Sequence, residues 1–175
     1  MTVGGPPAAE AQSKASFKCR NAIAAGVRGM TAAGLKQIDQ CHKARDKGGA
    51  QGDCNAVDPG NISSAFGRSA IRAREIINAR CKAGDPVIAN YPGNDIPVVL
   101  VPAIERILER SAGELQGAPV FVGDKQAVKA LVKCHGAIGK GRTQVVISIV
   151  KAGTKCQKKI DKKATSFGPI DPSCL

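Results

Sequence analysis

Lys18–Lys47 reads KCRNAIAAGVRGMTAAGLKQIDQCHKARDK, and Lys133–Lys162 reads KCHGAIGKGRTQVVISIVKAGTKCQKKIDK. Aligned without a gap, the two segments carry the same residue at ten of thirty positions. Each segment also holds two cysteines 22 positions apart, which are Cys19 and Cys41 in the first and Cys134 and Cys156 in the second. Self-similarity at a fixed offset indicates a duplicated structural unit. We therefore predict a chain built on a duplicated, cysteine-ended helix.

The composition favours closely packed helices with an aliphatic core. The 175 residues include four Phe, one Tyr and no Trp, whereas 20 are glycine. The formal charge of +12 attracts anions, so nucleic acid, acidic polysaccharide and anionic membrane surfaces are candidate partners. No apolar run reaches the ~20 residues that a membrane-spanning helix needs, and Met1–Ser16 lacks the apolar stretch of a signal peptide.

Cysteine usage bears on the cellular compartment. The chain has seven cysteines and two histidines, and no two cysteines form a C-x-x-C pair. A tetrahedral zinc site normally needs ligand pairs at such a short spacing, so disulfides are the better interpretation. Disulfides persist outside the reducing cytosol, and we therefore expect a secreted or extracellular protein, with the periplasm and the cell surface included.

Apolar residues recur at helical spacing in three long segments, which predicts an all-α fold with helices over 15–45, about Ile62–Arg80, and Lys125–Lys163. A shorter helix is expected over Ala103–Leu115. An irregular proline-rich stretch over 82–102 should precede it, with Val98–Val101 either packed on a helix or forming a short strand.

These elements predict two related disulfide-stapled antiparallel helical units, the second incomplete, joined by a proline-rich connector and a short helix. The expected boundaries are a flexible leader at 1–14, the first hairpin at 15–84, the connector at 85–123 and the second unit at 124–175. Asn61 or Asp58 is the expected cap of the second helix, and Asp124 that of the last.

Helix length decides how the cysteines pair. Along a straight helix Cys19 and Cys41 would lie ~33 Å apart, whereas the Cα atoms of a disulfide lie within ~7 Å. In an antiparallel hairpin, the start of the first helix meets the end of the second. This geometry predicts the nested disulfides Cys19–Cys81 and Cys41–Cys54, and Cys156–Cys174 mirrors the latter in the second unit.

Cys134 has no equivalent partner in this scheme. Three interpretations remain open: the chain derives from a longer protein, Cys134 forms an intermolecular disulfide, or it stays a free thiol. We favour the interpretation that the chain derives from a longer protein, and rank an intermolecular disulfide second.

Four short motifs resemble a cysteine-bounded helical-hairpin repeat found in predicted secreted bacterial proteins; they are Lys18–Ile23, Lys133–Ile138, Lys155–Ile160 and Asp53–Ala56. The resemblance covers 15–84 and 124–175. It implies secretion and disulfides, and the repeat has no established activity. The final helix of the second unit departs from the pattern because it is missing.

No catalytic or cofactor-binding pattern can be assembled, so we expect no enzyme and no cofactor or metal. His42 and His135 directly follow cysteines, but the C-x-x-C-H pattern of haem attachment is absent. Gly136–Thr143 is glycine-rich but departs from the phosphate-loop pattern. Neighbours on a helix point about 100° apart, so Cys134 and His135 do not form a nucleophile–base pair.

Basic residues dominate the last predicted helix. Eleven of the residues from Lys125 to Lys163 are Lys or Arg, and Asp161 is the one acid among them. Such a surface favours contact with phosphate or other polyanions. The candidate polyanion-binding residues are Lys140, Arg142, Lys151, Lys155, Lys158, Lys159, Lys162 and Lys163.

We therefore expect a secreted, non-catalytic structural or interaction protein. An unmatched half-hairpin is able to complete another molecule, which makes a self-assembling extracellular filament or surface component a specific hypothesis, with self-association or another extracellular protein as partner. The alternative is a basic binding module for nucleic acid, acidic polysaccharide or an anionic membrane surface.

Overall fold

The computed structural model describes residues 14–49, 52–82, 96–116, 124–163 and 172–174. These residues form four α-helices, namely α1 (Lys14–Arg45), α2 (Ala65–Arg80), α3 (Ile96–Gln116) and α4 (Lys125–Lys163), and the short 3-10 helix η3 (Pro172–Cys174). The all-α fold expected from the sequence is confirmed for this part of the chain. The expected leader at 1–14 lies, except for Lys14, outside the described residues.

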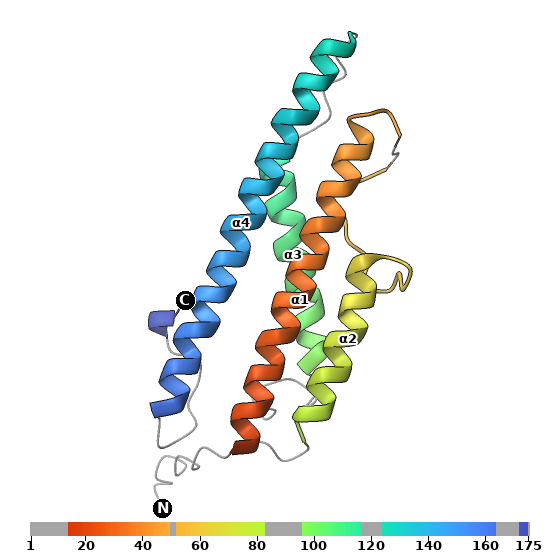
Figure 1. Cartoon of the computed structure of the whole chain (residues 1–175). Coiled ribbons are helices and arrows are strands. Elements are labelled where there is room, and N and C mark those ends of the chain that lie inside the picture. Colours follow the sequence, from red (N-terminus) through yellow and green to blue (C-terminus); the bar gives the residue numbers. More distant parts are fainter. Residues whose placement is uncertain (1–13, 50–51, 83–95, 117–123, 164–171, 175) are drawn as a thin grey trace, which may run out of the picture.

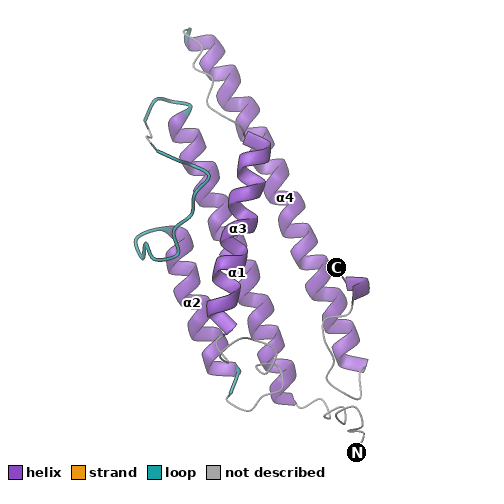
Figure 2. Ribbon diagram, turned by 180° about the vertical axis from the view of Figure 1, so that it is seen from behind, coloured by secondary structure: helices purple, strands orange, loops and turns teal. Residues whose placement is uncertain are grey.

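Helix α1 stands in the middle of the bundle (Figure 1). Helix α2 runs along one side of it and α4 along the other, and α3 packs behind α1 in this view. The view from behind places α3 in front of α1 (Figure 2), so α1 contacts all three other helices. No helix among the described residues is long and apolar enough to cross a membrane.

The second helix begins three residues later than expected, at Ala65. The predicted caps serve the preceding loop, because Asp58 Oδ1 accepts from the Gly60 N–H at 2.8 Å and Asn61 Oδ1 from the Ser63 N–H at 3.1 Å. Ser64 caps the helix, and its Oγ accepts from the Gly67 N–H at 2.9 Å. Side chains of this kind compete with the helix by closing local turns.

The third helix also differs from the expectation, since it starts at Ile96 and contains Pro102. The prediction of an irregular stretch up to Pro102, with a strand as one form of Val98–Val101, was therefore wrong from Ile96 onward. Proline removes one backbone hydrogen bond from a helix. Leu100 and Val101 pack against the core, and their burial offsets that loss.

An apolar cluster joins α1, α2 and α3, and its buried side chains include Met30, Leu35, Phe66 and Leu108. Glycines bring these helices close together. A Cβ on Gly34 would lie 2.2 Å from Leu108 Cδ1, so any larger residue there would displace the buried Leu108 side chain. The helical part of the expected connector therefore contributes to the core of the first hairpin.

Three disulfides join the cysteines that the sequence pattern pairs. The Cα atoms are 4.6 Å apart in Cys19–Cys81, 5.3 Å in Cys41–Cys54 and 5.5 Å in Cys156–Cys174. The first bond ties the start of α1 to the residue that follows α2, and the other two close the loops after α1 and α4. Cys134 is exposed and forms no disulfide with a described residue.

Candidate functional site

The two repeats lie against each other as antiparallel helices, α1 and α4 (Figure 1). Near one end of the pair, Arg20 forms an ion pair with Asp161. Near the other end, His135 Nδ1 lies 2.9 Å from Asp46 Oδ2. In the repeat alignment Arg20 corresponds to His135, and Asp46 corresponds to Asp161. The same contact is therefore made twice, once by each repeat.

A second pair of contacts obeys the same rule. Arg28 Nη1 donates to Thr154 Oγ1 at 3.3 Å, and Thr143 Oγ1 donates to Asp39 Oδ2 at 3.1 Å. In the alignment Arg28 corresponds to Thr143, and Thr154 corresponds to Asp39. Contacts that exchange in this way are the signature of an isologous, twofold-symmetric interface. Helices α1 and α4 are thus related by a local twofold axis that passes between their midpoints.

This symmetry makes it possible to compare the surfaces of α1 and α4 residue by residue. Helix α1 presents one stripe to α2, formed by Cys19, Ile23, Gly26, Met30 and Gly34. Cys19, Ile23 and Met30 are buried, and a Cβ on Gly26 would lie 3.1 Å from Ala73 Cβ. A Cβ on Gly34 would lie 3.2 Å from Phe66 Cδ2. The whole stripe is therefore covered.

The corresponding residues of α4 are Cys134, Ile138, Gly141, Val145 and Ile149, and we call this set the outer face of α4. The exposed fractions are 37% for Ile138, 58% for Val145 and 61% for Ile149. A Cβ on Gly141 would meet nothing within 4 Å, and Cys134 is exposed. The face that α2 covers on α1 is thus uncovered on α4 by any described residue.

The outer face ends at the disulfide Cys156–Cys174. There η3 packs on α4, and a Cβ on Gly153 would lie 3.0 Å from the Cys174 carbonyl oxygen. Cys41–Cys54 closes the corresponding end of the covered stripe on α1. The uncovered part of α4 therefore lies between Cys134 and Cys156. These positions correspond to Cys19 and Cys41, between which α2 covers α1.

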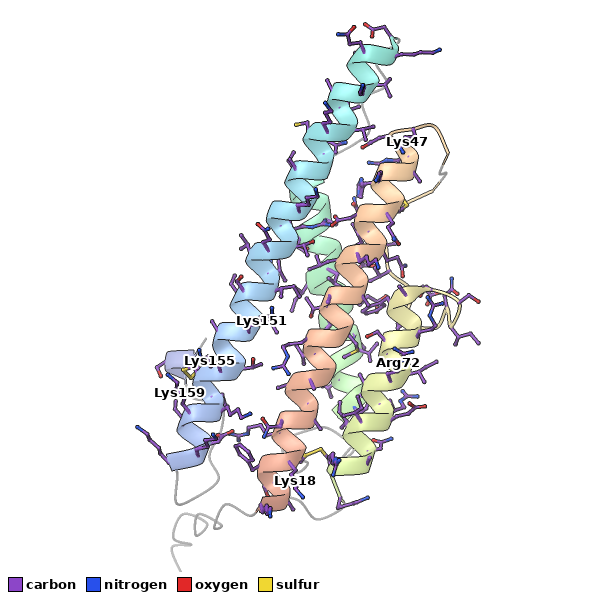
Figure 3. All side chains as sticks on the ribbon, in the orientation of Figure 1. Lys18, Lys47, Arg72, Lys151, Lys155 and Lys159 are labelled. Atoms are coloured by element: carbon purple, nitrogen blue, oxygen red, sulfur yellow. A yellow bond between two sulfur atoms is a disulfide. The ribbon has the colours of Figure 1, made fainter. Side chains whose placement is uncertain are left out.

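The expected polyanion-binding residues do not all lie at the surface. The seven lysines of that set are exposed, and Lys151, Lys155 and Lys159 lie on the side of α4 that faces away from α1 (Figure 3). Arg142 is only 4% exposed and pairs with Asp39. Its guanidinium belongs to the α1–α4 interface, so the expectation that Arg142 reaches an external anion was wrong.

A groove of about 850 Å³ lies between the upper parts of α1 and α4, and His42, Asp46, His135 and Thr143 line it. Within it, His42 contacts two polar side chains. His42 Nε2 lies 2.7 Å from Asn55 Oδ1, and His42 Nδ1 lies 2.8 Å from Arg45 Nη2. Because arginine only donates, Nδ1 accepts and His42 is neutral. Burial lowers the pKa of His42 from its ordinary value, in agreement with this state.

His135 therefore links α4 to the end of α1, and His42 links α1 to the loop that follows it. The structure separates Cys134 from His135. His135 points toward Asp46, the residue that follows α1, whereas Cys134 lies on the outer face of α4. The described residues contain no group of three or more His, Cys, Asp or Glu able to hold a metal ion. The pairing of His135 with Asp46 was not foreseen from the sequence, although the repeat alignment holds the signal for it.

The comparisons with known proteins add no relative, since no family model, curated protein or solved structure matches the chain.

Proposed function

We propose that the protein is a non-catalytic interaction protein of an oxidising, extracytoplasmic compartment, and that its second helical unit is completed by another polypeptide. The observation that carries this proposal is the outer face of α4, which repeats the α2-binding stripe of α1 but is exposed. Exposed apolar side chains that form a continuous stripe are a common mark of protein interaction sites.

The proposed compartment is supported by the three disulfides. Bonds of this kind persist where the thiol pool is oxidising and are rare in the cytosol. The resemblance inferred from the sequence, to a repeat of predicted secreted bacterial proteins, is consistent with the same location.

Completion by another polypeptide takes one of two forms. A second copy of the chain would build the self-assembling filament expected from the sequence, whereas a different protein would build a mixed complex. Both are structural or interaction roles, and both use the outer face of α4.

The test is to trap the thiols of the native protein by alkylation and to map its cysteines without reduction. We expect the six paired cysteines to be oxidised and Cys134 to be bonded to a cysteine of another polypeptide. Seven reduced thiols in native material would overturn the proposed compartment and the proposed function together.

The exposed lysines of α4 favour a second candidate function, the binding of polyanions. Binding carried by lysine–phosphate or lysine–sulfate contacts weakens steeply as salt rises. Heparin and duplex DNA should therefore bind at 50 mM salt and dissociate near 300 mM, roughly the range over which such contacts are lost. Absence of binding at the lower salt concentration would remove this candidate.

A further inference from the structure

The outer face of α4 also identifies the kind of helix that covers it. Resting on the function proposed above, we infer that Cys134 and the outer face of α4 bind an acidic amphipathic helix, carried by a different polypeptide, that ends in a cysteine. The argument combines the local twofold axis, the sizes of the residues on the face and the charge around it.

The local twofold axis predicts the geometry of the partner. On α1, helix α2 lies antiparallel and its following residue, Cys81, bonds to Cys19. Cys134 occupies the place of Cys19 in the second repeat. A helix that covers the outer face in the same way would therefore place a cysteine, just after its last turn, beside Cys134.

The residues of the outer face set the sizes of the side chains that the partner presents. Gly26 and Gly141 correspond, and Gly26 accepts the close approach of Ala73. The partner should therefore carry a small residue opposite Gly141. Gly34 faces Phe66, but its counterpart is Ile149, so the partner needs a smaller residue than phenylalanine at that point.

Charge distinguishes a different polypeptide from a second copy. The exposed charged side chains of α4 between Cys134 and Cys156 are all lysines, which are Lys140, Lys151 and Lys155. Helix α2 is itself basic, with four exposed arginines (Arg68, Arg72, Arg74 and Arg80) against one Glu75. Like charges across an interface disfavour association, whereas an acidic helix would be attracted. Within one chain, α2 is held by its loop and by Cys19–Cys81, but a partner from solution lacks that tether.

The bond itself is an ordinary thiol–disulfide exchange. Oxidised glutathione first converts the partner's cysteine into a mixed disulfide with glutathione and releases one glutathione thiol. The Cys134 thiolate then attacks the partner's sulfur, the bond between that sulfur and glutathione breaks, and glutathione leaves as a thiolate that takes up a proton. Docking on the outer face raises the effective concentration of the two sulfurs. The equilibrium yield of the disulfide with Cys134 therefore increases with the affinity of the helix for the outer face.

The test uses synthetic peptides and the full chain in a glutathione redox buffer. The probe copies Ala65–Cys81 with Phe66→Ala, Arg68→Glu, Arg72→Glu and Arg74→Glu, which makes it acidic and smaller opposite Ile149. Two peptides serve as comparisons, one with the native α2 sequence and one with the probe's residues scrambled ahead of the final cysteine. We expect the probe to form a mixed disulfide with Cys134 at least about tenfold more at equilibrium than either comparison. Its lead over the native α2 peptide should shrink in high salt.

Two glycines of α4 provide matched variants. A Cβ meets nothing within 4 Å at Gly141 or at Gly136, so both variants should fold. Gly141→Leu places a large side chain on the outer face. It should reduce the disulfide yield of the probe to that of the scrambled peptide. Gly136→Leu places the side chain on the opposite side of α4. The disulfide yield of the probe should therefore stay above that of the scrambled peptide.

Equal yields from the probe and the scrambled peptide would overturn the inference, and so would a preference for the basic α2 copy. A disulfide-linked homodimer through Cys134 that outcompetes the probe would assign the face to a second copy instead. In native protein, mapping should find Cys134 bonded to a cysteine that closes an acidic helix of a different polypeptide. A bond to a cysteine of the same polypeptide would sink the inference, whereas seven reduced thiols would instead sink the proposed function.

Discussion

Asp46 and Asp161 occupy the same position in the two repeats, and each closes one end of the α1–α4 pair. Asp161 pairs with Arg20, and Asp46 pairs with His135, which stands where the repeat places Arg20. This exchange relates the two helices by a local twofold axis, and no described residue covers the outer face of α4 in the way that α2 covers α1.

Gly26 and Gly141 correspond in sequence but differ in what surrounds them. Gly26→Leu should lower the free energy of unfolding by about 1–3 kcal/mol, because a Cβ there would lie 3.1 Å from Ala73 Cβ. Gly141→Leu should be neutral or stabilising by up to about 0.8 kcal/mol, because leucine favours a helix over glycine and nothing obstructs it. Urea denaturation of the two variants measures the difference, and equal effects would contradict the asymmetry of the two faces.

The ion pair of Asp39 with Arg142 should matter more than a surface pair. Asp39→Ala leaves the guanidinium of Arg142, which is only 4% exposed, without this carboxylate, and we expect a loss of about 3 kcal/mol. The double variant Asp39→Ala with Arg142→Met removes the buried charge and should recover most of that loss. Denaturant midpoints test both variants, and a double variant no more stable than Asp39→Ala would refute this account.

The burial of His42 should make stability depend on pH. Burial lowers the pKa of His42 below its ordinary value of 6.5, so below about pH 6.5 the unfolded chain binds a proton that the folded chain does not. The contribution of His42 to the free energy of unfolding is therefore fully present above pH 6.5. It falls as the pH is lowered further, by at most about 1.4 kcal/mol per pH unit.

His42→Gln is the control for this dependence, since glutamine does not titrate. Urea midpoints between pH 7.5 and about pH 5 should fall more steeply for the original protein than for the variant. Parallel curves would show that His42 does not contribute.

The disulfides Cys19–Cys81 and Cys156–Cys174 should contribute unequally to the stability of the folded protein. Cys19–Cys81 closes a separation of 62 residues and Cys156–Cys174 one of 18, which corresponds to about 4 and about 3 kcal/mol by chain entropy. Replacing both cysteines of a bond by serine should therefore destabilise more for the first pair. Thermal denaturation under non-reducing conditions gives the order, and the reverse order would contradict the entropic argument.

Much of the fold could be predicted because it follows from local signals. Periodicity placed α1 within one residue of its start and α4 at its observed limits. Helix α3 was missed over Ile96–Val101, because three nearby prolines argue against a helix when the sequence is read locally. Its apolar residues are buried in a core to which α1 and α2 also contribute, and that contact is not visible in the local sequence.

Local patterns were sufficient to predict α1, α4, the repeat and the cysteine spacing, because these depend on residues close together or on a fixed offset. The pairing of α1 with α4 about a local twofold axis appears only in the folded protein, since that contact joins residues such as Arg20 and Asp161, 141 positions apart. The tertiary structure also decided which lysines face solvent while Arg142 is buried, and which apolar stripe is covered. Burial of a helix residue depends on which other segments pack against that side of the helix, and those segments are often distant in sequence.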